Sequence, residues 1–151
     1  MVTRAELVAE ARMWVGTTFV HQHSAKGIGC DCMGLIRGIF LALGLAELDR
    51  LHLVPPEQIA YGPVPDGVTL RRGCESFLRP ISLEDARPGD MMLFRFGRDP
   101  QHTALLGDYV HGGLSLIHAL GPSHPGKVVE HRLDDSWRRN IVAAYAIPGV
   151  A

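Results

Sequence analysis

The sequence predicts a single α+β domain, covering residues 1–151, with an antiparallel sheet. A chain of 151 residues, 46% of them apolar, can bury one hydrophobic core. Apolar residues recur at helical spacing in the first half of the chain, and from residue 90 onward they alternate with a period of two. Helices therefore come first and strands follow with short connections, an order typical of helices packed beside an antiparallel sheet.

Two signals define the first helix and the loop that follows it. Thr3 and Glu6 fit a capping box, and the apolar spacing after them predicts a helix over residues 3–15. Residues 16–30 have no sustained period and contain three glycines and two histidines, so an extended surface loop is expected. Loops of this length are usually functional.

The next two helices flank a proline-rich stretch. Asp31 can cap a helix that closes at Gly44, which places Cys32 in the first turn. Residues 51–66 contain four prolines, which excludes a helix or a central strand there and favours an ordered connection within the domain. A third helix is expected over residues 66–79.

The remainder of the chain is expected to form strands. The first begins after residue 90, and further strands are expected over 102–106, 114–120, 127–132 and 141–147. Residues 107–113 would then form a hairpin loop centred on Val110. In that register residue 106 lies opposite residue 114, and residue 102 lies opposite residue 118.

Charge and composition exclude several classes of protein. The formal net charge is −1, so binding to nucleic acid or to an anionic membrane through phosphate charge is not expected. No stretch approaches the ~18 to 20 consecutive apolar residues of a membrane-spanning helix. Residues 1–10 lack the apolar run of a secretory signal, so we expect a soluble protein made in the cytoplasm without a signal peptide.

Cys32 is a candidate nucleophile. Three cysteines without framework spacing argue against a disulfide scaffold. A thiol in the first turn of a helix lies against free backbone N–H groups and the positive end of the helix dipole, which favours the thiolate. Gly34 would leave room for a substrate to approach the sulfur. The competing interpretation is a buried cysteine that only packs, which is the role expected for Cys30 and Cys74.

His102 and His118 are the candidate partners of this thiol. Directly opposed residues of an antiparallel pair have Cβ atoms ~4.5 to 5.5 Å apart, so one ring could orient the other. Together with Cys32 they would supply a nucleophile, a base and an orienting group. The alternative is that both rings only pack against the sheet.

Metal binding is a rival use of the nearby side chains. His21, His23, Cys30 and Cys32 offer four ligands, but only one residue separates the members of each pair, which is poor spacing for zinc. No metal and no cofactor is therefore expected. The remaining histidines lie in polar or loop contexts and are given no role: His52, His111, His124 and His131.

Several short motifs, in this order, resemble those of the NlpC/P60 cysteine peptidases. They are Asp31-Cys32-Met33-Gly34-Leu35, Arg87-Pro88-Gly89-Asp90, His102-Thr103-Ala104-Leu105-Leu106-Gly107 and Ile117-His118-Ala119. The resemblance implies a papain-like fold with Cys32 as nucleophile, His102 as base and His118 as the third, orienting residue. It also implies hydrolysis of amide bonds in peptidoglycan stem peptides, commonly the bond between D-glutamate and the diamino acid.

A narrower resemblance concerns residues 19–24 and 34–38, which are similar to the tail-associated cell-wall peptidases of phages and of the gene transfer agents of alphaproteobacteria. It implies tail-tip or hub proteins as partners and a virion-like tail that carries the enzyme to the periplasmic cell wall. Two other functions stay open: a non-catalytic tail component with an inert Cys32, and an acyltransferase or thioesterase using the same cysteine.

Two positions depart from the family pattern. Phe19 stands where many members carry a substrate-binding tyrosine, and Met33 stands where they carry serine. An oxyanion hole needs a positioned N–H or O–H donor, which the neighbouring loop could supply. The candidate substrate-binding residues are Asp31, Phe19, His21, Gln22 and His23.

Overall fold

A six-stranded antiparallel sheet forms the centre of the fold. The computed structural model describes residues 1–45, 69–97, 100–121 and 125–151. The strand order is β3-β8-β4-β5-β6-β7, and every neighbouring pair is antiparallel, as the period-two pattern predicts. The strands are β3 (Arg79–Ile81), β4 (Met91–Arg95), β5 (Pro100–Asp108), β6 (Leu114–Ala119), β7 (Val128–Arg132) and β8 (Ile141–Ala146).

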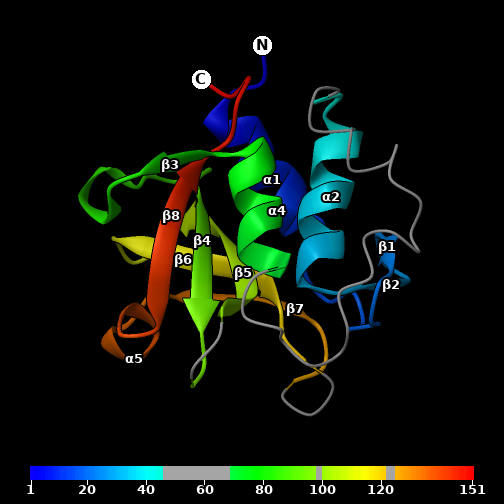
Figure 1. The fold of residues 1–151 in the computed structure, drawn as a ribbon. Helices are drawn as coiled ribbons and strands as arrows, with labels where there is room; N and C mark the ends of the chain where they lie inside the picture. Colours follow the sequence, from blue (N-terminus) through cyan, green and yellow to red (C-terminus); the bar gives the residue numbers. More distant parts are fainter. Residues whose placement is uncertain (46–68, 98–99, 122–124) are drawn as a thin grey trace.

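Three helices lie together on one side of this sheet (Figure 1). They are α1 (Arg4–Arg12), α2 (Cys32–Ala42) and α4 (Thr69–Phe77). A two-stranded hairpin of β1 (Ser24–Ala25) and β2 (Gly29–Cys30) precedes α2. Two short helical turns complete the described part: η1 (Leu83–Asp85) and α5 (Asp135–Arg138). None of the helices in these described ranges is long and apolar enough to cross a membrane.

The predicted helices are confirmed, with shifted ends. Both halves of the capping box are present in α1, since the Glu6 carboxylate accepts from the Thr3 N–H at 2.8 Å and Thr3 Oγ1 accepts from the Glu6 N–H at 3.2 Å. This helix stops at Arg12 because residues 13–16 form a turn. Asp31 caps α2 as expected. The predicted proline-rich connection over residues 51–66 lies outside the described residues.

Short elements account for most of the differences from the sequence prediction. The prediction of an extended loop over residues 16–30 is wrong in part, because the β1–β2 hairpin folds within it and its last residue is fully buried. The three-residue strand β3 and the four-residue helix α5 were not predicted either. Elements of this length carry too few residues to show a period.

The register of the β5–β6 hairpin differs from the predicted one by two residues. Leu106 pairs with Leu116 instead of Leu114, because β5 continues to Asp108 and the connecting loop is shorter than expected. A shift of two residues keeps every side chain on its predicted face of the sheet. His102 and His118 therefore share a face but lie diagonally rather than directly opposite one another.

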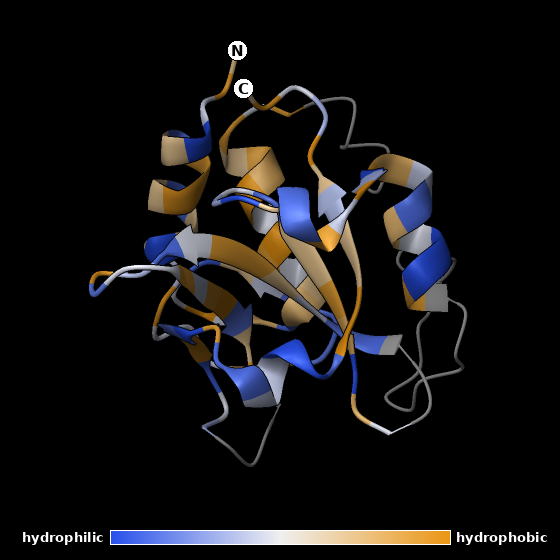
Figure 2. Cartoon of the chain, turned by 90° about the vertical axis from the view of Figure 1, so that its left-hand side faces the viewer, coloured by the Kyte–Doolittle hydropathy of each residue, from blue (hydrophilic) through white to orange (hydrophobic). Residues whose placement is uncertain are grey.

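Both faces of the sheet are covered. One hydrophobic cluster joins the three long helices to alternate sheet residues, among them Met91, Leu105 and Ile117. A second cluster lies on the other face, where Leu106 and Leu116 pack with residues that follow β7. Apolar residues are accordingly concentrated in the central strands (Figure 2).

Gly38 lies where α2 packs against the turn that follows α1. A Cβ atom at this position would overlap the indole ring of Trp14, which is 2% exposed. We expect Gly38→Ala to lower the free energy of unfolding by about 1–3 kcal/mol, because a packed core yields little to an added carbon. Denaturation in urea measures the change.

Gly73→Ala is the matched control for this substitution. Gly73 also lies inside a helix, α4, but a Cβ atom there has no neighbour within 4 Å among the described residues. Alanine should then raise stability by up to ~1 kcal/mol through helix propensity. Equal effects of the two alanines would contradict the packing argument.

The two ends of the described chain are paired with each other. Val2 and Val150 form a parallel bridge, and the Arg4 N–H donates to the Ala151 carbonyl at 3.0 Å. The Arg4 guanidinium also bonds the Asp90 carboxylate at 2.8 Å, which ties this end of the molecule to the turn before β4.

Candidate active site

Asp31 fixes the backbone on which Cys32 lies. One carboxylate oxygen accepts from the Gly34 N–H at 2.7 Å, which caps α2, and the other accepts from the Gln22 N–H at 2.7 Å. The same side chain therefore holds the start of the helix and the preceding loop together. Both oxygens bond the backbone here, one of them also lies 3.9 Å from His21 Nδ1, and contact with a substrate stays a prediction.

Gly34 has a different role from the predicted one. A Cβ atom at this position would overlap the backbone carbonyl of His23, so the space beside Gly34 is filled by the loop and is not open to a substrate. Ser24 Oγ donates to the Gly34 carbonyl at 2.6 Å and closes the same contact. Glycine is needed there because the loop crosses the first turn of α2.

The surroundings of Cys32 favour the thiol over the thiolate. Burial, followed by the charge of Asp31, raises the pKa of the thiol to about 11, although N–H donors of Thr103 and Met33 and the Thr103 hydroxyl lower it. The expected resting thiolate is therefore wrong for this form of the protein. The start of the helix does favour the thiolate, as predicted, but desolvation outweighs it. Attack by this sulfur then requires a base.

Three histidines from adjacent strands form a continuous hydrogen-bonded chain. His102 Nε2 lies 2.7 Å from His118 Nδ1, which confirms the predicted meeting of the two rings. His118 Nε2 in turn lies 2.7 Å from His131 Nε2, and His131 Nδ1 lies 2.9 Å from the Arg132 carbonyl oxygen. In both contacts the two residues lie diagonally across neighbouring strands. His118 is two residues out of register with His102 on β5, and it pairs with Val129 rather than with His131 on β7.

Nothing in the sequence pattern indicates a role for His131. The strand that carries it was predicted, over residues 127–132, but the register of that strand against β6 was not. A single polar residue on a strand carries no signal for its cross-strand neighbour unless the turn fixes the register.

Trp137 of α5 packs against all three rings. Its ring centroid lies 4.8 Å from that of His118, 5.2 Å from His131 and 6.2 Å from His102. The rings of Phe94 and Phe96 flank His102 at 6.1 and 6.0 Å. The histidines are thereby enclosed by aromatic side chains.

Burial in this enclosure favours the neutral form of His102 and His118. Burial, with a smaller effect of His131, lowers the pKa of His102 to about 4. Burial also lowers the pKa of His118, with further contributions from His102 and His131. At neutral pH the His102 imidazole is therefore an uncharged base.

Thr103 connects the cysteine to the histidines. It follows His102 in β5 and lies against the start of α2, where its backbone N–H and hydroxyl act on the Cys32 thiol and its Oγ1 lies 3.6 Å from Met33 Sδ. Within the described residues no hydrogen bond joins this thiol to an imidazole. The geometry places Cys32 beside the neighbour of His102, and the nucleophile–base pairing stays a prediction.

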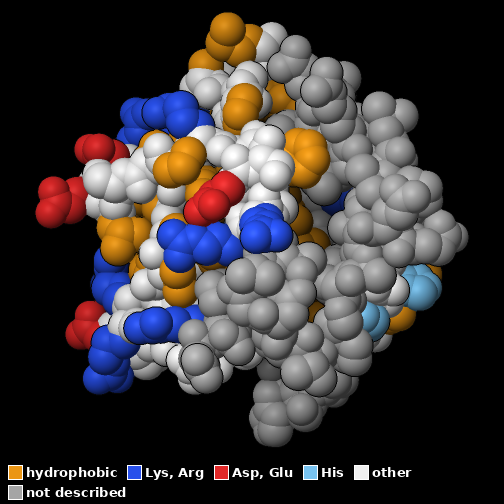
Figure 3. Space-filling view, in the orientation of Figure 1, with side chains coloured by type: hydrophobic (Ala, Val, Ile, Leu, Met, Phe, Trp, Pro, Cys, Tyr) orange, Lys and Arg blue, Asp and Glu red, His pale blue; other side chains and the backbone are white. Residues whose placement is uncertain are grey.

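The predicted substrate-binding residues lie in the loop before α2. Phe19 is partly buried against the core and bridges to Cys30, whereas His21, Gln22 and His23 are exposed. Gln22 has a φ of 58°, in the left-handed region that non-glycine residues seldom adopt. Imidazole groups reach the surface beside the β1–β2 hairpin (Figure 3). Substrate binding by these residues stays a prediction.

The other two cysteines pack as expected. Cys30 and Cys74 are 0% and 1% exposed and belong to the hydrophobic core, and burial raises the pKa of each thiol to about 12. Among the side chains that the structure describes, no group of three or more His, Cys, Asp or Glu could hold a metal ion.

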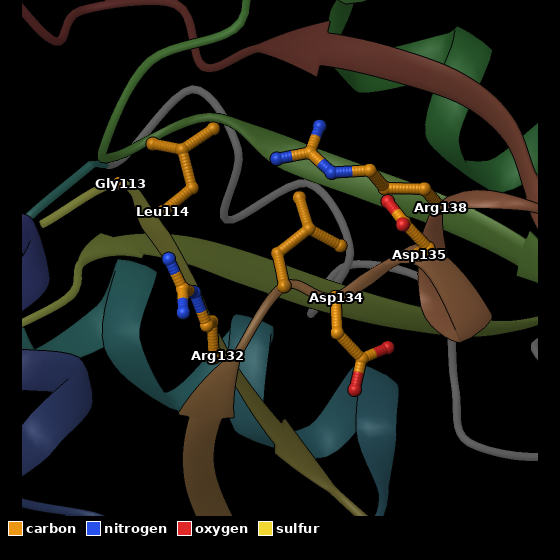
Figure 4. A pocket seen from close by; sticks show the side chains of 7 residues that line it. Gly113, Leu114, Arg132, Asp134, Asp135 and Arg138 are labelled. Atoms are coloured by element: carbon orange, nitrogen blue, oxygen red, sulfur yellow. The ribbon is translucent and has the colours of Figure 1, made fainter.

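A polar hollow borders the turn between β7 and α5. Its walls carry both signs of charge, so it favours neither an anion nor a cation, and the Asp134 carboxylate in it already accepts from the Trp137 N–H at 3.1 Å. Figure 4 shows the lining residues, which are Gly113, Leu114, Arg132, Leu133, Asp134, Asp135 and Arg138.

The buried histidines predict a stability that depends on pH. Their pKa values are depressed in the folded state, so the unfolded chain binds more protons below the ordinary histidine pKa near 6.5. We expect the free energy of unfolding to fall as the pH drops from about 6.5 toward 4, by up to about 1.4 kcal/mol per pH unit for each histidine. Urea denaturation at a series of pH values measures this slope.

His118→Gln should flatten the slope, because glutamine has no proton to gain. The exposed His111 provides the control, and His111→Gln should leave the slope unchanged. An equally steep loss of stability in the His118 variant would show that other groups cause it.

Comparison with solved structures identifies the fold. The crystal structure of the NlpC/p60 domain of the peptidoglycan hydrolase SagA matches with a TM-score of 0.61 and 25% identity, covering 97% of this chain and 100% of that chain. An NLP/P60-family, lipoprotein-like protein from Staphylococcus aureus matches with a TM-score of 0.62 and 19% identity, covering 95% of this chain but 41% of its own length. An N-acetylmuramoyl-L-alanine amidase from Bacteroides uniformis matches with a TM-score of 0.57 and 12% identity, covering 94% and 96%.

No protein-family model matches the sequence, and no curated protein matches it at a significant level. The structural matches nevertheless cover nearly the whole chain, and the first also covers the whole of the domain it matches. They agree with the α+β architecture and with the papain-like fold implied by the sequence motifs. The chain therefore has the fold of the NlpC/P60 domains, one of which is the domain of a peptidoglycan hydrolase.

Proposed function

We propose that this protein is a cysteine peptidase that hydrolyses amide bonds in peptidoglycan stem peptides. The observation that carries the proposal is the buried hydrogen bond between His102 and His118. Thr103, the residue after His102, lies against the Cys32 thiol. The domain that holds these residues has the NlpC/P60 fold. Base-assisted thiol attack requires a neutral imidazole within reach of the thiol, and a second ring that holds the imidazole supports this role.

The proposed reaction begins with transfer of the thiol proton from Cys32 to Nδ1 of His102 as the sulfur attacks the amide carbonyl. The backbone N–H of Cys32 and a donor from the preceding loop stabilise the tetrahedral oxyanion. His102 then gives its proton to the leaving amine, and the C–N bond breaks. Water hydrolyses the resulting thioester and regenerates the thiol, while His118 keeps the His102 ring oriented.

The neighbours favour a bond in the cell wall as the target. One is a peptidoglycan hydrolase, and another is an N-acetylmuramoyl-L-alanine amidase. We favour the bond between D-glutamate and the diamino acid, which the motif resemblance implies, over the bond that an amidase would cleave. Phe19 supplies no hydroxyl to such a substrate, so we propose that the exposed residues 21–23 supply a donor in addition to the backbone N–H of Cys32.

Digestion of purified peptidoglycan tests the proposal. Mass spectrometry of the soluble products should show peptides with a new amino group on the diamino acid, formed by the wild type and not by Cys32→Ala. Release of intact stem peptides from the glycan would instead assign the amidase bond. Products that carry an added acyl acceptor would indicate acyl transfer, and no products from any wall would favour a non-catalytic role.

We further propose that a phage-like tail carries the enzyme to the wall. The support is the similarity of residues 19–24 and 34–38 to tail-associated peptidases. The chain should then be found in purified particles, bound to tail-tip or hub proteins. Particles that lack it, with the protein free in the cytoplasm, would point to recycling of released wall peptides.

A further inference from the structure

His131 ends the histidine chain on an atom that can only accept a hydrogen bond. The Arg132 carbonyl oxygen lies 2.9 Å from His131 Nδ1, so the proton of this bond must reside on the nitrogen. A neutral imidazole carries one N–H, and with Nδ1 protonated the other nitrogen of His131, Nε2, is an acceptor.

The proton on His131 Nδ1 determines which nitrogens of His118 and His102 carry their protons. His118 Nε2, at 2.7 Å from His131 Nε2, must donate to it, which leaves His118 Nδ1 as an acceptor. His102 Nε2, at 2.7 Å from His118 Nδ1, must then donate in its turn. The lone pair of His102 is thereby left on Nδ1, the ring nitrogen that is not bonded to another histidine.

We propose that His131 is a positioning residue, which fixes the tautomer of His102 so that Nδ1 is unprotonated and available as the base. The inference deepens the proposed function, and its kinetic part rests on that function. A protonated His131 would donate from Nε2, reverse both bonds and place a proton on His102 Nδ1, where no base could act. His102 Nδ1 stays unprotonated only while each N–H in the chain donates toward the Arg132 carbonyl.

The setting of the three rings favours a fixed direction. His118 is 0% exposed and His102 is 8% exposed, so no water competes for the nitrogen atoms between them. Trp137 packs on all three rings and limits their rotation. A ring flip at His118 would put carbon atoms where Nδ1 and Nε2 lie and would break both hydrogen bonds, which is costly in a buried site.

Nuclear magnetic resonance of histidines labelled with ¹⁵N tests the assignment without substrate. At about pH 8, above the ordinary histidine pKa, long-range ¹H–¹⁵N spectra distinguish a nitrogen that carries a proton from one that does not. We expect protons on Nε2 of His102 and His118 and on Nδ1 of His131. A proton on Nδ1 of His102 in the wild type overturns the inference.

Two substitutions at residue 131 add the causal test. His131→Phe keeps a ring but removes the acceptor, and we expect a mixture of His102 tautomers with a fall in kcat of roughly fivefold to tenfold at little change in KM. His131→Gln offers an oxygen acceptor to His118 Nε2 and should restore both the tautomer and most of kcat. His111→Phe, at an exposed loop position, is the matched control and should change neither.

The readouts separate this inference from the proposed function. An unchanged His102 tautomer in His131→Phe overturns the inference even if peptidoglycan is hydrolysed. The expected tautomers in a protein that hydrolyses nothing support the positioning role and contradict the peptidase assignment. If His131→Phe does not fold, the wild-type spectrum and His131→Gln still decide the question.

Discussion

Cys32→Ala should abolish hydrolysis of peptidoglycan peptides. The sulfur is the atom that would form the thioester, and removal of a nucleophile typically lowers kcat by roughly four to six orders of magnitude. The Asp31 cap and the bond between Ser24 and the Gly34 carbonyl do not involve the thiol, so the fold should persist. Product formation on purified wall, followed by mass spectrometry over long incubation, measures the loss.

Cys74→Ala is the matched control. This thiol is as buried as a core residue and lies in α4 rather than at the start of α2. Its replacement should cost about 1 kcal/mol of stability and leave turnover unchanged. Residual hydrolysis by Cys32→Ala near the wild-type rate would refute the nucleophile, and equal losses in the two variants would point to stability rather than chemistry.

His102→Gln should lower turnover by about three orders of magnitude at neutral pH, because the thiol it serves is protonated at rest. The pKa of the Cys32 thiol is raised to about 11, so almost no thiolate exists at pH 7 without a base. Glutamine can still bond to His118 and keeps the site filled. Initial rates across a pH series measure the effect.

The rates of the wild type and of His102→Gln should depend on pH in different ways. In the wild type, activity should rise as His102 loses its proton near its pKa of about 4 and then level off. In His102→Gln the thiolate must form unaided, so the rate should increase about tenfold per pH unit toward the thiol pKa of about 11. A variant profile that is flat above pH 7 would contradict the base role. His111→Gln, exposed in the β5–β6 loop, should keep the wild-type profile.

Local signals made much of the fold predictable. The helix starts at Thr3 and Asp31 were found because a cap and its partner lie within three residues of each other, and those contacts are present. The sheet was predicted because alternation is a property of neighbouring residues. The β5–β6 register was not, because Gly112 and Gly113 adopt φ values of 92° and 84° and allow a tighter loop than the sequence spacing suggested.

The candidate site was predictable only where strand alternation or a helix end determined it. His102 and His118 lie on one face of the sheet for any register shift of an even number of residues, and the Asp31 cap places Cys32 at the start of α2. His131 and Trp137 were missed because their contacts depend on the β6–β7 register and on a four-residue helix. The protonated thiol was missed because burial comes from the whole fold and not from the helix end alone.

The pairing of Val2 with Val150 has a topological consequence. Both ends of the described chain emerge together, at the end of the molecule away from the start of α2 (Figure 1). A short glycine-rich linker could join them, and the exposed tip at Val110 could supply new ends, giving a circular permutant with the sheet intact. Cargo fused at either end of this chain would likewise project away from Cys32.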